Sequence, residues 1–372
     1  MKLSNVVISL SLLGVAGCKA TPSSNPITPV APQNGVHSYN GTASVGDFLT
    51  ITLDPTAHTL TYSNHSNGDA GIIPYTVNSD ATYALHDPTG NLLAAYEVPG
   101  YALLVQAAKT GPNHNAKALI TAVQSTAITL STLENHSYNY MQFRTAAGGI
   151  EAGNVSMDAK GALTISSYWP FGAQNQQSSP FNASGFPANS FTEDASGKFI
   201  VHDDGQGSFD YMFGTQNGIF AVDTSNGAVL GLLKASTKDF DPTFAGTYKA
   251  IFYQKTGASS GQGNVETGTP SLGNATLVVG ANGAVTLKDA QNTVLAQGTL
   301  APVADTPYLY GSSGELSDPC FGLFTFRVLT PTSQQDVFVT FQGRAVLFSY
   351  FRATLPMGPS NVYDYLYGVA VR

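Results

Sequence analysis

The fold of this chain is decided by Ala275-Thr276-Leu277-Val278-Val279-Gly280-Ala281-Asn282-Gly283-Ala284-Val285-Thr286-Leu287. On both sides of the Gly280 to Gly283 segment, every second residue is apolar. A period of two is typical of a strand with one buried face, and glycine with asparagine is typical of a tight turn. The stretch therefore predicts two antiparallel strands that form a hairpin.

The same pattern occurs at two earlier places, in Phe48 to Tyr62 and in Asn154 to Ile165. The second and third copies align without a gap, so that Gly161 corresponds to Gly283, whereas the first copy needs one extra turn residue. A later hairpin also recurs, with Tyr83 to Leu93 resembling Phe191 to Val201. These recurrences indicate an internal repeat.

An aromatic strand precedes each copy and contains Tyr39, Tyr140 or Tyr248, which are 101 and 108 residues apart. We therefore predict an all-β chain with little or no helix, built from tandem antiparallel sandwich or meander-barrel units at 36–135, 136–243 and 244–372. The alternative is a meander in which Asx-x-Gly turns recur by chance. The one candidate for a helix, Ala116 to Gln124, fits a strand equally well.

The composition argues against nucleic acid as a partner. The 372 residues contain 16 Lys and Arg against 24 Asp and Glu, for a formal net charge of −8, and no basic run occurs. Binding to phosphates requires clustered basic side chains. Charged residues make up 11% of the chain, against about 25% in typical soluble domains. With 20 Phe and 18 Tyr, this composition suits an exported β protein.

Residues 19–35 separate the β region from the amino terminus and contain four prolines with little apolar bulk. Such a segment cannot bury enough surface to fold, and proline favours an extended polyproline geometry. We predict a stiff tether that reaches up to roughly 50 Å at about 3.1 Å per residue.

The first eighteen residues have the features of an export signal. Lys2 is followed by an apolar run from Val6 to Ala16, which is shorter than the roughly twenty residues that span a bilayer. Leu12-Leu13-Gly14-Val15-Ala16-Gly17-Cys18 ends this run and resembles the lipobox of bacterial lipoproteins. The alternative is an ordinary signal peptide with an incidental cysteine.

The resemblance implies that 1–17 are a signal peptide removed before Cys18, and that Cys18 carries a diacylglyceryl group and an acylated (palmitate-type) amino terminus. The membrane would then be a partner through this lipid, which belongs to the 18–35 tether. The resemblance also implies a cell-envelope location. Lys19 after the cysteine would favour the outer membrane if the source has one. Two or more acyl chains give stable anchoring.

The second cysteine, Cys320, has no partner for an intrachain disulfide once Cys18 is lipidated. A leftover thiol in an exported protein is either reactive or a small buried apolar residue. We predict the buried role.

No Ser-x-x-Lys motif for nucleophilic catalysis occurs. The acidic stretch from His202 to Asp210 has the wrong phase for a calcium loop and predicts a turn. His58 and His65 lack a third nearby ligand for zinc. We therefore predict no catalytic residues, no metal and no cofactor. Paired carboxylates for glycoside cleavage are defined by distance, so a polysaccharide hydrolase of the envelope stays the alternative function.

The candidate ligand-binding residues are aromatic. Tyr168, Trp169 and Phe171 precede a polar stretch at 172–189. Long loops without secondary structure are often functional, and an aromatic platform beside amides suits a glycan or a protein ligand. The alternative is a core tryptophan followed by a plain connection. From the sequence we predict a lipid-anchored envelope protein with a binding or structural role rather than an enzyme.

Overall fold

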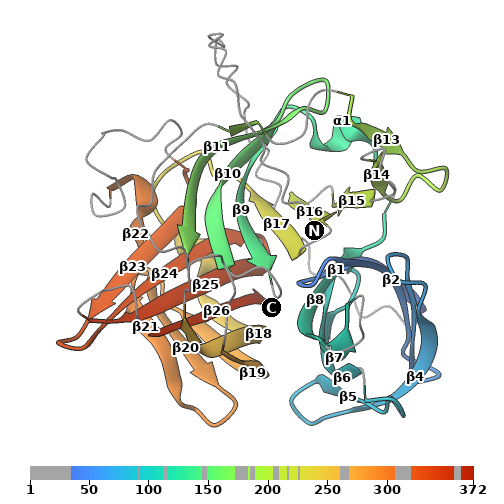
Figure 1. Ribbon diagram of the computed structural model, residues 1–372, viewed down its shortest axis with the longest axis horizontal. Helices are drawn as coiled ribbons and strands as arrows, with labels where there is room; N and C mark the ends of the chain where they lie inside the picture. Colours follow the sequence, from blue (N-terminus) through green and yellow to red (C-terminus); the bar gives the residue numbers. More distant parts are fainter. Residues whose placement is uncertain are drawn as a thin grey trace.

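The structure is a computed structural model of the chain. It describes residues 35–90, 92–111, 116–126, 128–144, 149–171, 183–184, 189–203, 209–215, 218–224, 227–259, 268–305, 320–355 and 362–372, with side chains left out at 144, 149–150, 168–171, 183–184, 258–259 and 362. Within these ranges helix is confined to α1 (Leu130–Leu133) and the 3-10 turns η1 (Pro242–Phe244) and η2 (Val303–Asp305). The prediction of an all-β chain with tandem barrel-like sheets is confirmed (Figure 1).

The first sheet is a closed antiparallel barrel in which the first strand pairs with the last. Its strands are β1 (His37–Ala43), β2 (Asp47–Asp54), β3 (Thr59–Asn64), β4 (Ala70–Val77), β5 (Thr82–Leu85), β6 (Leu92–Val98), β7 (Ala102–Thr110) and β8 (Ala116–Gln124). The segment from Ala116 to Gln124, whose sequence fits helix and strand equally well, is therefore strand β8. Its six consecutive buried residues, Ala118 to Val123, lie on both faces of the sheet, because Ile120 packs inside the barrel while Leu119 packs outside it against the other sheets.

The second sheet contains nine strands. They are β9 (His136–Arg144), β10 (Gly149–Met157), β11 (Leu163–Phe171), β12 (Ala183–Ser184), β13 (Phe191–Glu193), β14 (Ile200–Asp203), β15 (Phe209–Gly214), β16 (Ile219–Thr224) and β17 (Gly227–Leu233). Strand β9 pairs with β17, and each neighbouring pair is antiparallel. The two edge strands, β12 and β13, consequently run in the same direction and lie close together in the chain. The sheet is barrel-like, and we call it the second barrel.

The third sheet repeats this arrangement. Its strands are β18 (Gly246–Ser259), β19 (Thr269–Val279), β20 (Ala284–Asp289), β21 (Val294–Thr299), β22 (Ala301–Pro302), β23 (Leu323–Leu329), β24 (Ser333–Gln342), β25 (Ala345–Thr354) and β26 (Val362–Val371). Strand β18 pairs with β26, and the edges are β21 and β22, which only Leu300 separates. The segment 294–302 therefore bonds to β20 through β21 and to β23 through β22, and we call this sheet the third barrel.

Several repeat positions are equivalent in the structure. Tyr39, Tyr140 and Tyr248 lie on the first strand of their units and are at most 2% exposed. Gly161 and Gly283 both adopt a left-handed conformation, with φ of 75° and 77°, which glycine tolerates at no steric cost. The three sheets span 37–124, 136–233 and 246–371, and the domain limits inferred from the repeat stay a prediction.

The later hairpin lies at the same place in the strand order of the first two sheets. The turn at Gly90 joins β5 to β6, the fifth and sixth strands of the first sheet. The turn at Gly197 joins β13 to β14, the fifth and sixth strands of the second sheet. The two turns have the same chemistry because Asx-x-Gly suits any tight turn between antiparallel strands.

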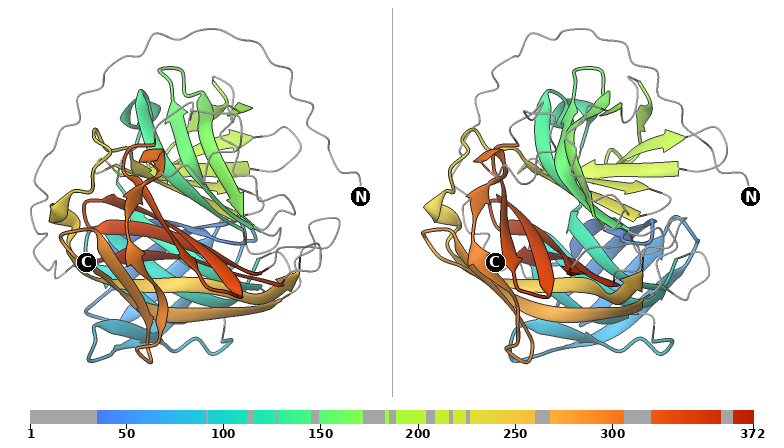
Figure 2. Two further views of the ribbon diagram at one scale, coloured as in Figure 1. Left: turned by 90° about the vertical axis from the view of Figure 1, so that its left-hand side faces the viewer. Right: turned by 60° about the vertical axis from the view of Figure 1, so that its left-hand side comes forward.

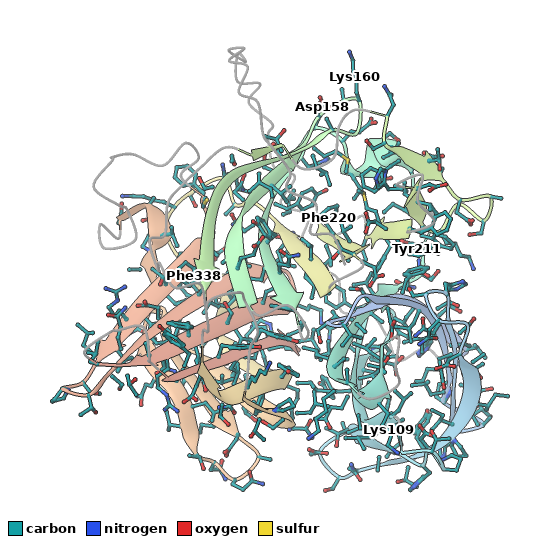
Figure 3. All side chains as sticks on the ribbon, viewed as in Figure 1. Lys109, Asp158, Lys160, Tyr211, Phe220 and Phe338 are labelled. Atoms are coloured by element: carbon teal, nitrogen blue, oxygen red, sulfur yellow. The ribbon has the colours of Figure 1, made fainter. Side chains whose placement is uncertain are left out.

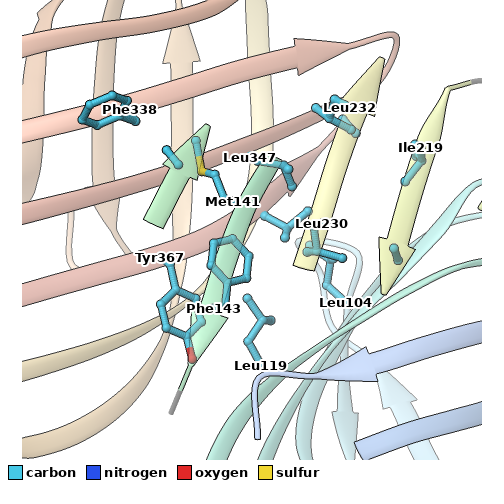
Figure 4. Packing of buried hydrophobic residues seen from close by; sticks show 14 of the residues in the cluster. Leu104, Leu119, Met141, Phe143, Ile219, Leu230, Leu232, Phe338, Leu347 and Tyr367 are labelled. Carbon is cyan, nitrogen blue, oxygen red and sulfur yellow. The ribbon is translucent and has the colours of Figure 1, made fainter. Parts of the chain in front are cut away.

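The three barrels meet at one shared apolar cluster, the junction core, formed by side chains on their outer faces. Figure 2 shows the first barrel (blue to cyan) below the second (green) from two sides, and Figure 4 shows the junction core at close range. Phe143 of β9 stacks on Tyr367 of β26 with ring centroids 4.3 Å apart and an interplanar angle of 7°. Tyr211 of β15 stacks on Phe48 of β2 at 4.4 Å, where the second barrel meets the first (Figure 3).

Polar contacts also join the barrels. The Thr42 hydroxyl of β1 donates to Asp223 Oδ1 of β16 at 2.5 Å, and Gln106 Nε2 of β7 donates to Asn274 Oδ1 of β19 at 2.9 Å. Cys320 is 1% exposed within the junction core, so the buried position predicted for it is confirmed. None of the helices in the described ranges is long and apolar enough to cross a membrane.

Candidate functional site

A cavity of about 230 Å³ lies inside the second barrel. Its lining is mostly apolar and comes from five strands of that barrel. The lining residues are Tyr140 and Gln142 (β9), Glu151 and Val155 (β10), Leu163 and Ile165 (β11), Phe220, Val222 and Thr224 (β16), and Val229 (β17). A pocket with mostly apolar walls and a few polar groups is the usual form of a small-molecule site.

Strand alternation places these side chains. Tyr140 and Gln142 face the cavity, while Met141 and Phe143, at the intervening positions of β9, pack in the junction core. Since successive side chains of a strand point to opposite faces, β9 supports the cavity with one face and the rest of the protein with the other. The part of the cavity wall that β9 forms is therefore supported from behind by the junction core.

One row of the lining follows from strand register. Glu151 pairs with Gln142, Gln142 with Val229, and Val229 with Val222. These four residues lie side by side across β10, β9, β17 and β16. The row therefore changes from polar to apolar along its length, with the carboxylate at one end.

The polar groups of the cavity are connected. The Tyr140 hydroxyl donates to Glu151 Oε1 at 3.0 Å, and Gln142 is the register partner of Glu151. The Thr224 hydroxyl donates to the carbonyl of Gly227 at 3.0 Å and so is used within its own turn. The polar wall of the cavity consequently consists of Tyr140, Gln142 and Glu151.

Side-chain size explains the space. An eight-stranded barrel is just wide enough for side chains to fill or to hold one small ligand. The interior of the third barrel is filled with large rings, among them Phe326, Phe348 and Tyr350, and a pocket there has about 10 Å³. The cavity wall of the second barrel has valine at positions 222 and 229. The space that larger aromatic side chains would fill at these positions stays open.

The first barrel uses its buried carboxylate differently. Glu97 Oε1 accepts from the Tyr39 hydroxyl at 2.5 Å and lies 2.6 Å from His37 Nδ1, while Glu97 Oε2 accepts from the Tyr83 hydroxyl at 2.8 Å. Burial, and then the nearby Glu97 charge, raise the pKa of both tyrosines. These contacts join strands β1, β5 and β6 of the first barrel. We assign the cluster a structural role.

The predicted aromatic residues adjoin the cavity in the chain. The backbone of Tyr168, Trp169 and Phe171 belongs to β11, the strand that supplies Leu163 and Ile165 to the lining, but their side chains lie outside the described residues. Of the 172–189 stretch, only 183–184 and 189 are described. Cys18 also lies outside the described residues.

The remaining candidates from the sequence form no visible site. His202 pairs with Asp210 across β14 and β15, while 204–208 lie outside the described residues. His65 packs against Phe48, and His58 packs against Tyr75. No group of three or more His, Cys, Asp or Glu is placed to hold a metal in the described part of the chain.

Sequence reasoning missed the polar wall, although a signal was present. The sequence marks Tyr140 as a repeat position, but no motif marks Gln142 or Glu151 as a site residue. Both are polar residues at positions that face a barrel interior. In a half-buried strand the positions that face the core are normally apolar. Polar residues at 142 and 151 are therefore the sign of a site that the sequence contains.

Comparison with known proteins does not assign a family. No family model matches the sequence, and no curated protein matches it. Similar solved structures include a variant of transferrin-binding protein B from Haemophilus parasuis, with 7% identity, a TM-score of 0.23, and coverage of 92% of this chain and 77% of that one. Transferrin-binding protein B from Neisseria meningitidis has 10% identity, a TM-score of 0.20 and coverage of 91% and 77%.

A third similar structure is a protein of unknown function from Nostoc punctiforme, with 10% identity, a TM-score of 0.20, and coverage of 91% of this chain and 96% of that one. TM-scores of this size carry no argument about function. The description of the site therefore rests on the chain's own residues.

Proposed function

We propose that this chain is a lipid-anchored binding protein of the cell envelope that holds a small apolar molecule inside its second barrel. The cavity of about 230 Å³ carries the proposal. An apolar cavity of about 150 Å³ inside a protein core binds benzene, so the space here suits a body of roughly one or two rings. The apolar walls at Val155, Leu163 and Val222 would provide the affinity.

The lipobox supports the envelope location. Lipid on Cys18 and the 19–35 tether would hold the barrels outside the membrane, within roughly 50 Å of its surface. The outer membrane is the proposed membrane if the source has one, because Lys19 follows the cysteine.

The alternative, a polysaccharide hydrolase, finds less support in the cavity. Glycoside cleavage generally uses two carboxyl groups on either side of the bond. Glu151 is the one carboxylate among the lining residues that the structure describes. The apolar remainder of the wall also offers a sugar few hydrogen-bonding partners. Binding is therefore the function that we propose.

The anchor is tested by Cys18→Ala. This variant is expected to lose both metabolic acyl labelling and partitioning into detergent, because the thiol is the lipid acceptor. Cys320→Ala is the matched control, since it removes the buried cysteine and should keep full labelling. Continued labelling of Cys18→Ala would show that the lipobox reading is wrong.

The cavity is tested by Val229→Phe. Val229 borders the cavity and is half-buried, so the larger ring is expected to enter the space and to reduce affinity for 1-aminoanthracene by about tenfold or more. Fluorescence of this probe, corrected for detergent alone, measures the change. Val278→Phe is the control, because Val278 is 41% exposed on β19 of the third barrel and is not among the cavity-lining residues.

Equal probe binding by both valine variants and the parent protein would remove the support for a ligand in the second barrel. Release of reducing ends from a glycan panel by the parent protein would favour the hydrolase instead.

A further inference from the structure

We infer that the ligand of the second barrel carries an aromatic ring that stacks on the ring of Phe220, and that Gly231 determines the space open to it. This inference rests on the proposed binding function and specifies its ligand class. Three observations carry it. Phe220 borders the cavity, the ring of Tyr138 stacks on Phe220, and both rings lie against the bare backbone of Gly231.

The Phe220 ring gives the apolar part of the cavity an aromatic surface. Phe220 lies on β16, is 1% exposed to solvent and borders the cavity. Its ring and the ring of Tyr138 have centroids 5.0 Å apart and an interplanar angle of 25°. Tyr138 is not among the lining residues that the structure describes. The tyrosine therefore covers one side of the Phe220 ring and holds it in place, while another side adjoins the cavity.

Strand pairing places Gly231 beside Phe220. Gly231 of β17 is the register partner of Phe220 on β16. A Cβ atom at Gly231 would lie 3.0 Å from Phe220 Cδ1 and 3.1 Å from Tyr138 Cβ, which is closer than an ordinary contact between carbon atoms at about 3.5–4.0 Å. The missing side chain therefore lets both rings approach strand β17 closely, and the space in front of Phe220 stays open.

The opposite wall suits the second face of a flat ring. It consists of branched aliphatic side chains, including Leu163 and Ile165 of β11. Strand β11 is four places from β16 in the sheet order, so these side chains border the cavity across from Phe220. A ligand ring between them would contact an aromatic face on one side and aliphatic carbon on the other. Stacked aromatic pairs gain affinity beyond the area that they bury, so an aromatic ring is favoured over a saturated one.

The test compares 2-phenylethanol with 2-cyclohexylethanol, which share the hydroxyl group and the linker and differ in the ring. The saturated ring is the more hydrophobic of the two, so burial of apolar surface alone favours the cyclohexyl compound. Calorimetry on the full-length protein in detergent, corrected for binding to detergent alone, measures each dissociation constant. We expect 2-phenylethanol to bind about threefold more tightly, which is the scale of one aromatic pair.

Phe220→Leu keeps an apolar side chain and removes the ring, and is expected to reverse the preference in favour of 2-cyclohexylethanol. Phe191→Leu is the matched control. Phe191 is 4% exposed in the same interior core and is not among the cavity-lining residues, so this variant should keep the preference for 2-phenylethanol.

Gly231→Ala tests the role of the glycine while Phe220 stays in place. The new methyl group is expected to push the Phe220 ring toward the open space of the cavity and to weaken binding of both alcohols by about threefold or more. Gly71→Ala is the control, because a Cβ atom there would also crowd an aromatic ring, with Tyr62 Cε1 at 2.9 Å, but in the first barrel. It should leave both dissociation constants unchanged.

Equal binding of the two alcohols by the parent protein, or tighter binding of 2-cyclohexylethanol, would overturn the ligand class and leave the proposed function standing. A preference for 2-phenylethanol that persists in Phe220→Leu, or that Phe191→Leu also loses, would overturn the role of Phe220. Unchanged affinities in Gly231→Ala would overturn the role of Gly231, and this measurement stands even if Phe220→Leu does not fold.

Failure of both alcohols to bind the parent protein would overturn this inference. The proposed function would be overturned with it only if 1-aminoanthracene also failed to bind.

Discussion

Phe143→Ala is expected to lower the free energy of unfolding by about 3–5 kcal/mol, the cost typical of deleting a buried phenylalanine ring. Phe143 is 1% exposed and belongs to the junction core. Its ring stacks on Tyr367 of the third barrel at 4.3 Å. Removal would leave a cavity where the second and third barrels meet, and the strands on both sides are too constrained by their ladders to fill it.

The measurement is urea unfolding, with the midpoint and slope compared between the variant and the parent protein. Phe209→Ala is the control, because Phe209 is 46% exposed on β15 and its loss should change stability by less than about 1 kcal/mol. If Phe143→Ala and Phe209→Ala lowered the free energy of unfolding by similar amounts, the junction core would contribute less to stability than its burial indicates.

Asp223→Asn is expected to flatten the dependence of stability on pH. Asp223 is 1% exposed between the first and second barrels and accepts the Thr42 hydroxyl at 2.5 Å. Burial, and then the like charges of Asp47 and Asp210, raise the pKa of Asp223 well above its usual value. The folded protein therefore binds this proton more tightly than the unfolded chain does.

The sign follows from that difference. Below the unfolded pKa of about 3.9, both states hold the proton and the stabilising effect is fully present. As pH rises from there toward the raised folded pKa, the unfolded state releases its proton first, and stability falls by up to about 1.4 kcal/mol per pH unit. Above the folded pKa this dependence ends.

The asparagine variant keeps an oxygen that can accept from Thr42 and has no proton to lose. The free energies of unfolding of Asp223→Asn and the parent protein are measured across this range. As pH rises, the value for the parent protein should fall below the value for the variant by a growing amount. Asp239→Asn, at an exposed position, should track the parent. Parallel curves for all three proteins would show that Asp223 does not bind its proton more tightly in the folded state.

The all-β class and its hairpins could be predicted because strand alternation and turn chemistry are local properties. Leu277, Val279, Val285 and Leu287 show the alternation within a dozen residues, and all four are buried. Segments buried on both faces carry a weaker signal. Strand β8 fits helix or strand for this reason, since the apolar residues among its six consecutive buried positions belong to two different cores.

The cavity could not be predicted in this way. Glu151, Gln142, Val229 and Val222 become neighbours only through the pairing of β9 with β17, which closes the barrel across about ninety residues of chain. The volume of the cavity depends on the small size of the side chains at Val222 and Val229. The alternation of apolar and polar residues along a strand does not show whether a barrel interior is filled or open. Trp169, predicted as a binding residue, belongs to the third strand of the barrel that holds the cavity, and its side chain lies outside the described residues.

The pairing of first and last strands has a consequence for the modularity of the chain. In each barrel the backbone arrives and departs on hydrogen-bonded neighbours, β1 with β8, β9 with β17, and β18 with β26. Successive barrels can therefore be linked by connectors such as 125–135 and 234–245, without a long crossover. A duplication or deletion of one unit would leave every ladder of the others intact, so the chain could gain or lose a whole barrel while each remaining barrel keeps its own hydrogen-bonded sheet.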